Sequence, residues 1–82
     1  MIRVLFFARL REELGVSSLD IPAGEVKTLE ELKHYLYNQH PDWADYLIDT
    51  KILSAVNQVY VKENIDLVDG DEVAFFPPVT GG

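Results

Sequence analysis

The feature that most restricts the fold is one amphipathic helix, predicted at about residues 28–39, in a chain whose other segments mostly favour strands. Thr28-Leu29-Glu30-Glu31 is a capping box, in which the threonine hydroxyl accepts a hydrogen bond from the last amide and the last carboxylate reaches back. Leucines then recur at helical spacing until Pro41, at positions Leu29, Leu32 and Leu36. Because such a stripe covers only one face of a sheet, the pattern predicts an α+β fold whose other sheet face lacks a helix.

Apolar or alternating runs, with turn residues between them, predict five strands, at residues 2–7, 17–21, 52–56, 59–61 and 72–76. A short helix over residues 8–14, capped by Gly15, separates the first two strands. One or two helical turns between residues 41 and 49 are expected to bring Trp43 into the core. At 82 residues, the chain is expected to form one domain, with a mixed sheet packed on one main helix.

Strand parity predicts an apolar cluster on the sheet face away from the helix. Successive strand residues face opposite sides, and Arg3 and Glu72 mark the solvent side of the first and last strands. Four large side chains then fall on that side: Leu5, Phe7, Tyr60 and Phe76. An exposed cluster of this kind usually marks a partner surface. The alternative is that Tyr46, Leu47 or another loop covers it.

The C-terminal segment has the composition of a handle that projects from the domain. It reads Phe75-Phe76-Pro77-Pro78-Val79-Thr80-Gly81-Gly82, an aromatic pair followed by two prolines and a glycine tip. At about 3.1 Å per residue in extended geometry, residues 77–82 would project roughly 18 Å. The tip has no side chains, so it fits a channel too narrow for other residues. We therefore expect a domain at 1–76 and a tail at 77–82 that delivers the Gly82 carboxylate. The plainer alternatives are a frayed end and prolines that only terminate the last strand.

The composition argues against several classes of function. The 14 acidic and 7 basic residues give a net charge of −7, which is the wrong sign for nucleic acid and suits basic protein surfaces. The sequence has no cysteine and therefore no disulfide, thiolate metal site or thiol nucleophile. No apolar run is long enough to span a membrane, and no signal peptide is evident. We expect a cytoplasmic protein without a nucleic-acid or membrane partner.

No enzyme site is evident in the sequence. His34 and His40 lack metal-ligand spacing, the hydroxyl residues have no nearby base, and phosphate-binding motifs are absent. The chemistry that remains is that of the terminal carboxylate. Adenylation by ATP would give this group a good leaving group. Attack by a sulfur donor would then form a thiocarboxylate, whereas attack by an amine would form an isopeptide. The residues alone do not distinguish these two reactions.

Three motifs make the chain similar to a known family. They are Val4-Leu5-Phe6-Phe7-Ala8, Leu53-Ser54-Ala55-Val56-Asn57-Gln58 and the run from Asp69 to Gly82. Over its whole length the chain resembles the MoaD family, the small, sulfur-carrying subunit of molybdopterin synthase with a ubiquitin-like β-grasp fold. The last motif is long and highly specific, whereas residues 16–50 are more generic.

This resemblance implies a reaction at the tail. Gly82 would be adenylated by a ubiquitin-activating-like adenylyltransferase that uses ATP, and a sulfurtransferase or cysteine desulfurase would supply sulfur for the thiocarboxylate. Gly81 would let the tail pass into the large catalytic subunit, within a heterotetramer. Sulfur would then pass to cyclic pyranopterin monophosphate in molybdenum cofactor biosynthesis. The chain would be a non-catalytic sulfur donor that binds no cofactor or metal itself.

The resemblance also implies an interface with the large subunit. Phe7, Tyr60 and Phe76 match the hydrophobic interface positions of the family, where a leucine is usual at the Tyr60 position. Strand parity places the same three residues on the open face by an independent argument. The expected partner-binding set is completed by Leu5, Pro77, Pro78, Val79 and Thr80.

Two other classes of function remain open. The first is a sulfur carrier for a different product, the thiamine thiazole or a thiolated tRNA. Such carriers share the fold and the Gly-Gly end, but they are not expected to have the Phe-Phe-Pro-Pro-Val run. The second is a non-catalytic ubiquitin-like interaction module whose tail only docks. A docking module should tolerate one residue appended to the C-terminus, whereas a carrier should lose sulfur transfer.

Overall fold

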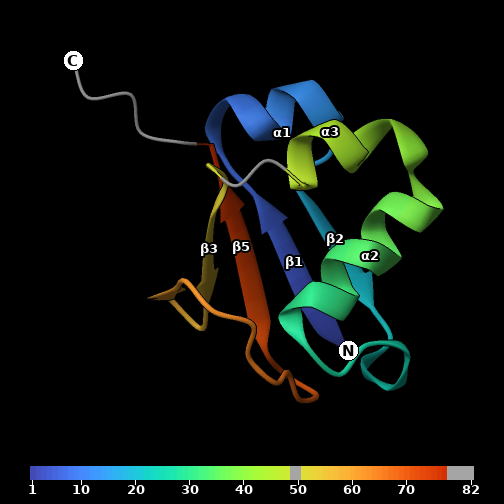
Figure 1. Ribbon diagram of the computed structural model, residues 1–82, viewed down its shortest axis with the longest axis vertical. Helices are drawn as coiled ribbons and strands as arrows, with labels where there is room; N and C mark the ends of the chain where they lie inside the picture. Colours follow the sequence, from blue (N-terminus) through green and yellow to red (C-terminus); the bar gives the residue numbers. More distant parts are fainter. Residues whose placement is uncertain (49–50, 78–82) are drawn as a thin grey trace.

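The computed structural model describes residues 1–48 and 51–77 of the chain. One sheet has the strand order β2-β1-β5-β3-β4 (Figure 1). Its strands are β1 (Ile2–Phe6), β2 (Ser18–Ile21), β3 (Leu53–Val56), β4 (Val59–Val61) and β5 (Glu72–Phe76). β1 and β5 lie parallel at the centre, and the other neighbouring strands are antiparallel. The predicted α+β class with a mixed five-stranded sheet is therefore confirmed.

The main helix, α2 (Leu29–Gln39), crosses one face of the sheet (Figure 1). Thr28 caps it as predicted, because its Oγ1 accepts a hydrogen bond from the Glu31 N–H at 3.2 Å. The Glu31 carboxylate reaches back to the N–H of Lys27, also at 3.2 Å, one residue earlier than a standard capping box. The leucine stripe is buried, with Leu32 and Leu36 at no more than 1% exposure.

The remaining helical elements are short. They are α1 (Ala8–Leu14), α3 (Ala44–Leu47) and two 3₁₀ turns, η1 (Ala23–Glu25) and η2 (Pro41–Trp43). Gly15 ends α1 in the left-handed conformation at φ 77°, as its position predicts. Trp43 is buried against the ring of Phe6, with ring centroids 5.5 Å apart. None of the described helices is long and apolar enough to cross a membrane.

The core lies between α2 and the inner sheet face. Val4 and Phe6 of β1 and Val73 and Phe75 of β5 all point inward and are almost fully buried. Val59 differs from its neighbours, because it pairs with inward-facing Val56 and is nevertheless 64% exposed. Val59 lies on the edge strand β4, outside the core that buries the inward-facing residues of the central strands.

The turn between β3 and β4 lies beside the turn that leads into β5. Asn57 and Gln58 join β3 to β4 with positive φ values of 51° and 70°, the geometry of a tight hairpin. The side chain of Asn57 donates to Asp71 at 2.9 Å and accepts from the Glu72 N–H at 3.0 Å. The hairpin is thereby tied to the chain entering β5, and the start of the central strand is held in place.

Candidate functional site

The outer face of the sheet carries an apolar surface at the end where β5 stops. We call it the sheet-face patch, formed by Leu5, Phe7, Leu53, Ala55, Tyr60, Ala74 and Phe76. Most of these residues line one shallow hollow of about 250 Å³, together with Gln58 and Glu72. The strand register explains the set, because Leu5 pairs with Ala74, Ala74 with Ala55, and Ala55 with Tyr60. Directly paired residues share a face, so one row runs across four strands.

Aromatic contacts give the patch a fixed shape. The rings of Phe7 and Phe76 are stacked, with centroids 4.9 Å apart and planes 7° from parallel. The ring of Tyr60 contacts Phe76 from the other side, with centroids 5.8 Å apart and planes 52° from parallel. Phe7 and Tyr60 are 38% and 65% exposed. Stacked rings lose little further rotamer entropy on binding, so the patch is preorganised for an apolar partner.

The local backbone holds Phe7 in this position. Its N–H donates to the carbonyl of Phe75 at 3.2 Å, so Phe7 continues the β1–β5 pairing beyond the end of the strand. Ala8 follows with a left-handed φ of 55°, and α1 begins there. Left-handed geometry is costly for residues with a Cβ, and the small alanine side chain keeps the steric conflict low. The abrupt turn separates the phenyl ring from the helix that follows it.

The described residues proposed as alternative covers do not lie over the patch. Leu47 is 1% exposed within the core, and Tyr46 packs against that same core cluster. Both therefore contact the inner side, whereas the patch lies on the outer face. The sheet-face patch is accordingly an exposed apolar surface of the described part of the chain.

The structure brings together the four predicted sheet residues Leu5, Phe7, Tyr60 and Phe76. Pro77 follows directly and is half-buried. The other predicted site residues lie outside the described residues: Pro78, Val79, Thr80, Gly81 and Gly82. Sequence reasoning missed Leu53, which pairs with Phe76 and is 37% exposed. Parity along β3 would have found it, because inward-facing Ser54 and Val56 require Leu53 and Ala55 to face outward.

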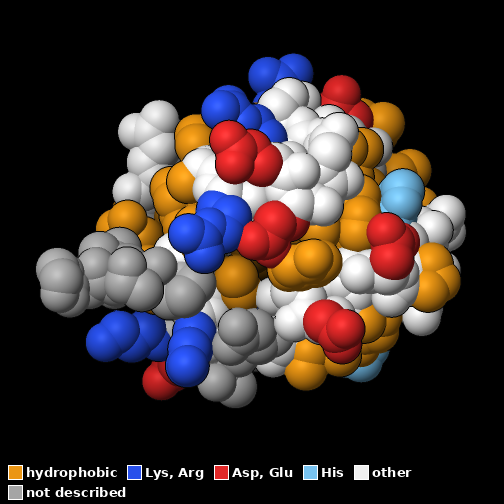
Figure 2. All heavy atoms as spheres, turned by 90° about the horizontal axis from the view of Figure 1, so that it is seen from above, with side chains coloured by type: hydrophobic (Ala, Val, Ile, Leu, Met, Phe, Trp, Pro, Cys, Tyr) orange, Lys and Arg blue, Asp and Glu red, His pale blue; other side chains and the backbone are white. Residues whose placement is uncertain are grey.

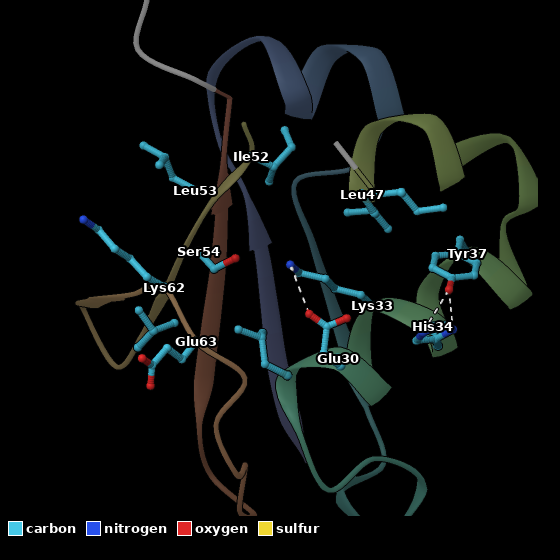
Figure 3. A pocket seen from close by; sticks show the side chains of 13 residues that line it. Glu30, Lys33, His34, Tyr37, Leu47, Ile52, Leu53, Ser54, Lys62 and Glu63 are labelled. Atoms are coloured by element: carbon cyan, nitrogen blue, oxygen red, sulfur yellow. Dashed lines mark hydrogen bonds and ion pairs between the residues drawn. The ribbon is translucent and has the colours of Figure 1, made fainter. Parts of the chain in front are cut away.

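A second hollow, of about 800 Å³, lies between α2 and the β3–β4 side of the sheet (Figure 3). Four of its polar side chains contact each other in pairs: Lys33 pairs with Glu30 at 4.0 Å, and the Tyr37 hydroxyl bonds to the His34 ring. Ser54 points toward α2, whereas Leu53 and Lys62 point away from it. The described residues contain no group of three or more His, Cys, Asp or Glu side chains that could hold a metal ion.

One carboxylate shows a clear electrostatic effect, at the far end from the patch. The Met1 ammonium hydrogen-bonds to the Asp69 side chain and holds the pKa of that carboxyl below its ordinary value of 3.8. The N–H of Gly70 contributes in the same direction. Asp69 is highly exposed, so the contact orients the two chain segments more than it stabilises them.

Comparisons with known proteins agree over almost the full chain. The model of the ThiS family matches residues 4–82. The molybdopterin synthase sulfur carrier subunit of Escherichia coli (strain K12) is 50% identical over all of both chains. The crystal structure of SAMP1 from Haloferax volcanii has a TM-score of 0.81 at 26% identity, with 99% of this chain and 98% of that chain covered. The complex of subunits 1 and 2 of the molybdopterin-converting factor from Helicobacter pylori 26695 contains a chain with a TM-score of 0.70 at 26% identity, with 99% and 97% covered.

Proposed function

The chain belongs to the ThiS family, and from that membership we propose that it is the sulfur carrier subunit of a molybdopterin synthase. The observation that carries the proposal is the 50% identity to the Escherichia coli sulfur carrier subunit, which spans both chains in full. The ubiquitin-like β-grasp fold agrees with it. The sheet-face patch adds a physical reason, because an exposed aromatic surface at the end of β5 suits a partner that receives the segment following Phe76.

The proposed chemistry begins at the Gly82 carboxylate. This group attacks the α-phosphate of ATP in an adenylating partner enzyme, and pyrophosphate leaves. The terminal sulfur of a persulfide, held by a sulfurtransferase or cysteine desulfurase, then displaces AMP. A thiol reduces the resulting acyl disulfide and releases the terminal thiocarboxylate. The chain needs no bound cofactor for these steps, since ATP is bound by the adenylating partner.

The proposed acceptor complex is the large catalytic subunit, in a heterotetramer with two copies of each chain. Support for a large-subunit partner comes from the Helicobacter pylori complex of subunits 1 and 2. In our proposal the patch residues Phe7, Tyr60 and Phe76 pack against the large subunit. The segment from Pro77 to Gly82 then enters its pocket and donates sulfur to cyclic pyranopterin monophosphate. We place this reaction in the cytoplasm.

Intact-mass spectrometry tests the proposal most directly. The protein is incubated with ATP, an adenylating enzyme and a sulfur donor, and fragmentation then localises any mass change. We expect an exchange of one oxygen for sulfur on Gly82. Localisation is needed because oxidation of Met1 adds the same nominal mass.

The matched control is a chain with one residue appended after Gly82, which should remain unmodified. The proposal is wrong if Gly82 of the unextended chain stays unmodified while the same enzymes modify another carrier. A modified chain that yields no molybdopterin with the large subunit and cyclic pyranopterin monophosphate would instead indicate a carrier for another product.

A second function uses the same activated carboxylate. The Haloferax volcanii neighbour is a small archaeal modifier protein, and its fold overlays almost the whole of this chain. Attack of a lysine amine on the adenylate would release AMP and form an isopeptide. Gly82 linked to lysine in tryptic fragments, formed without any sulfur donor, would support this function.

A further inference from the structure

The hollow between α2 and the β3–β4 side of the sheet contains a hydroxyl that the fold leaves unused. Ser54 is 6% exposed, and it is buried, unlike the other hydroxyl, amide and charged side chains of the described residues. Its neighbours on the adjacent strands, Val61 and Phe75, are apolar. The Ser54 side chain has no hydrogen-bond partner within residues 1–48 and 51–77, and its oxygen is not sealed from the hollow. The hydroxyl therefore contributes no hydrogen bond to the fold and is available to a ligand.

A second hydrogen-bond donor is directed into the same hollow from α2. The side chain of Lys33 is 21% exposed, and its Nζ lies 4.0 Å from Glu30 Oε1. Figure 3 shows the Lys33 ammonium directed toward β3 and the Ser54 hydroxyl directed toward α2. Because an ammonium has three donors, Lys33 keeps donors beyond its contact with Glu30. Two donors from opposite walls thus suit one acceptor oxygen in the hollow.

The charges around the hollow favour a neutral acceptor. Two lysines and two carboxylates line it: Lys33, Lys62, Glu30 and Glu63. The ring of His34 is bound to the Tyr37 hydroxyl. In the view from above, Lys and Arg side chains in the middle likewise lie next to Asp and Glu side chains (Figure 2). A carboxylate or phosphate at Lys33 would also approach Glu30, whereas the carbonyl of an amide carries no net charge. The polar part of the hollow therefore fits an amide carbonyl.

The rest of the hollow offers aliphatic surface. Ile52 and Val61 line it and are half-buried, and Ile48 and Leu53 line it with 61% and 37% exposure. Its volume of about 800 Å³ lies within the usual range of ligand sites, about 300–1,000 Å³. An aliphatic side chain that enters the hollow would remove apolar surface from water on both partners. A peptide unit with an aliphatic side chain matches both parts of the hollow.

The shape and position of the hollow favour a peptide that belongs to a larger partner. Its walls are α2 on one side and β3–β4 on the other, so it is a groove between two elements (Figure 3). Leu53 lines this groove and also belongs to the sheet-face patch, through its pairing with Phe76. The groove and the patch are therefore continuous at Leu53. A protein that packs on the patch can reach the groove without leaving the surface.

We propose that this groove binds an extended peptide segment of a partner protein. A backbone carbonyl of the segment accepts hydrogen bonds from the Ser54 hydroxyl and the Lys33 ammonium. A neighbouring aliphatic side chain of the segment packs on Ile52 and Val61. The groove is a second binding site of the chain, and it does not depend on the chemistry proposed at Gly82.

The first test is a titration of the ¹⁵N-labelled full chain with the peptide acetyl-Gly-Leu-Gly-amide, followed by nuclear magnetic resonance. The matched control peptide has serine in place of leucine. We expect the leucine peptide to shift the amide signals of Lys33, Ser54 and Val61 saturably, and the serine peptide to bind at least about fivefold more weakly. Shifts confined to the sheet-face patch, or equal binding of the two peptides, would overturn the inference.

The second test separates a binding role of the Ser54 hydroxyl from a structural one. Ser54→Ala should bind the leucine peptide about three- to tenfold more weakly, because one hydrogen bond is lost. It should unfold at the same or a higher temperature, because no bond within the fold is lost. Lys33→Met, which keeps the aliphatic stem, should also weaken binding. Ser18→Ala, at an exposed serine on β2, is the matched control and should bind normally. Unchanged peptide affinity in Ser54→Ala, whatever its unfolding temperature, would overturn the inference.

Discussion

At the scale of single residues, Ala8 holds a backbone angle that its side chain disfavours. Its φ of 55° lies in the left-handed region, although it begins α1. Replacing alanine by glycine inside a helix normally costs about 0.5–1 kcal/mol. Here the glycine would instead relieve a left-handed penalty of about 1–2 kcal/mol. We expect Ala8→Gly to leave the free energy of unfolding unchanged or to raise it by up to about 1 kcal/mol, measured by urea denaturation.

The chain supplies a matched control for this substitution. Ala44 has ordinary right-handed geometry, with φ −56° and ψ −42°. Ala44→Gly should therefore lower the free energy of unfolding by about 1 kcal/mol. If both glycine variants destabilise the domain equally, the backbone strain at Ala8 has no energetic role.

Elements with strong local signals could be predicted closely, whereas their arrangement could not. β5 coincides with its predicted range of 72–76, and α2 differs from its predicted range by one residue, because caps and periodicity act locally. The sheet order depends on pairing β1 with β5, which are some 70 residues apart, and no local pattern encodes that contact. Leu53 differs, because the parity of β3 already directs it outward, and its pairing with Phe76 brings it into the patch.

At the scale of elements, α2 contributes to the stability of the fold through its buried leucine stripe. Leu36 is 1% exposed and faces the core. Leu36→Ala removes buried methyl groups and leaves a cavity, so we expect the free energy of unfolding to fall by about 2–5 kcal/mol. Asn38→Ala, on the exposed side of the same helix, should change it by less than about 0.5 kcal/mol. Comparable losses in the two variants would contradict the packing of α2 on the sheet.

At the scale of the whole molecule, the Met1 ammonium and Asp69 bring the first residue to the turn before β5. The pKa of Asp69 is lowered in the folded state, so the contact favours folding above the ordinary value of 3.8. That contribution is lost as the pH falls from 3.8 through the folded pKa. We expect Asp69→Asn to reduce the pH dependence of thermal unfolding below pH 4, with a small effect because the pair is exposed. An unchanged acid slope in the variant would show that the pair contributes nothing.

The central position of β5 has a consequence for how the protein is made. β1 pairs with its neighbour in sequence, β2, and β3 pairs with β4, but without β5 both β1 and β3 would have one unpaired edge. During translation β5 is the last strand to leave the ribosome. A nascent or truncated chain without it exposes two strand edges, which chaperones and proteases recognise in unfinished proteins and which favour aggregation. Folding is thus completed by the strand that leads directly into Pro77, and a misfolded copy would present no assembled aromatic surface to a partner.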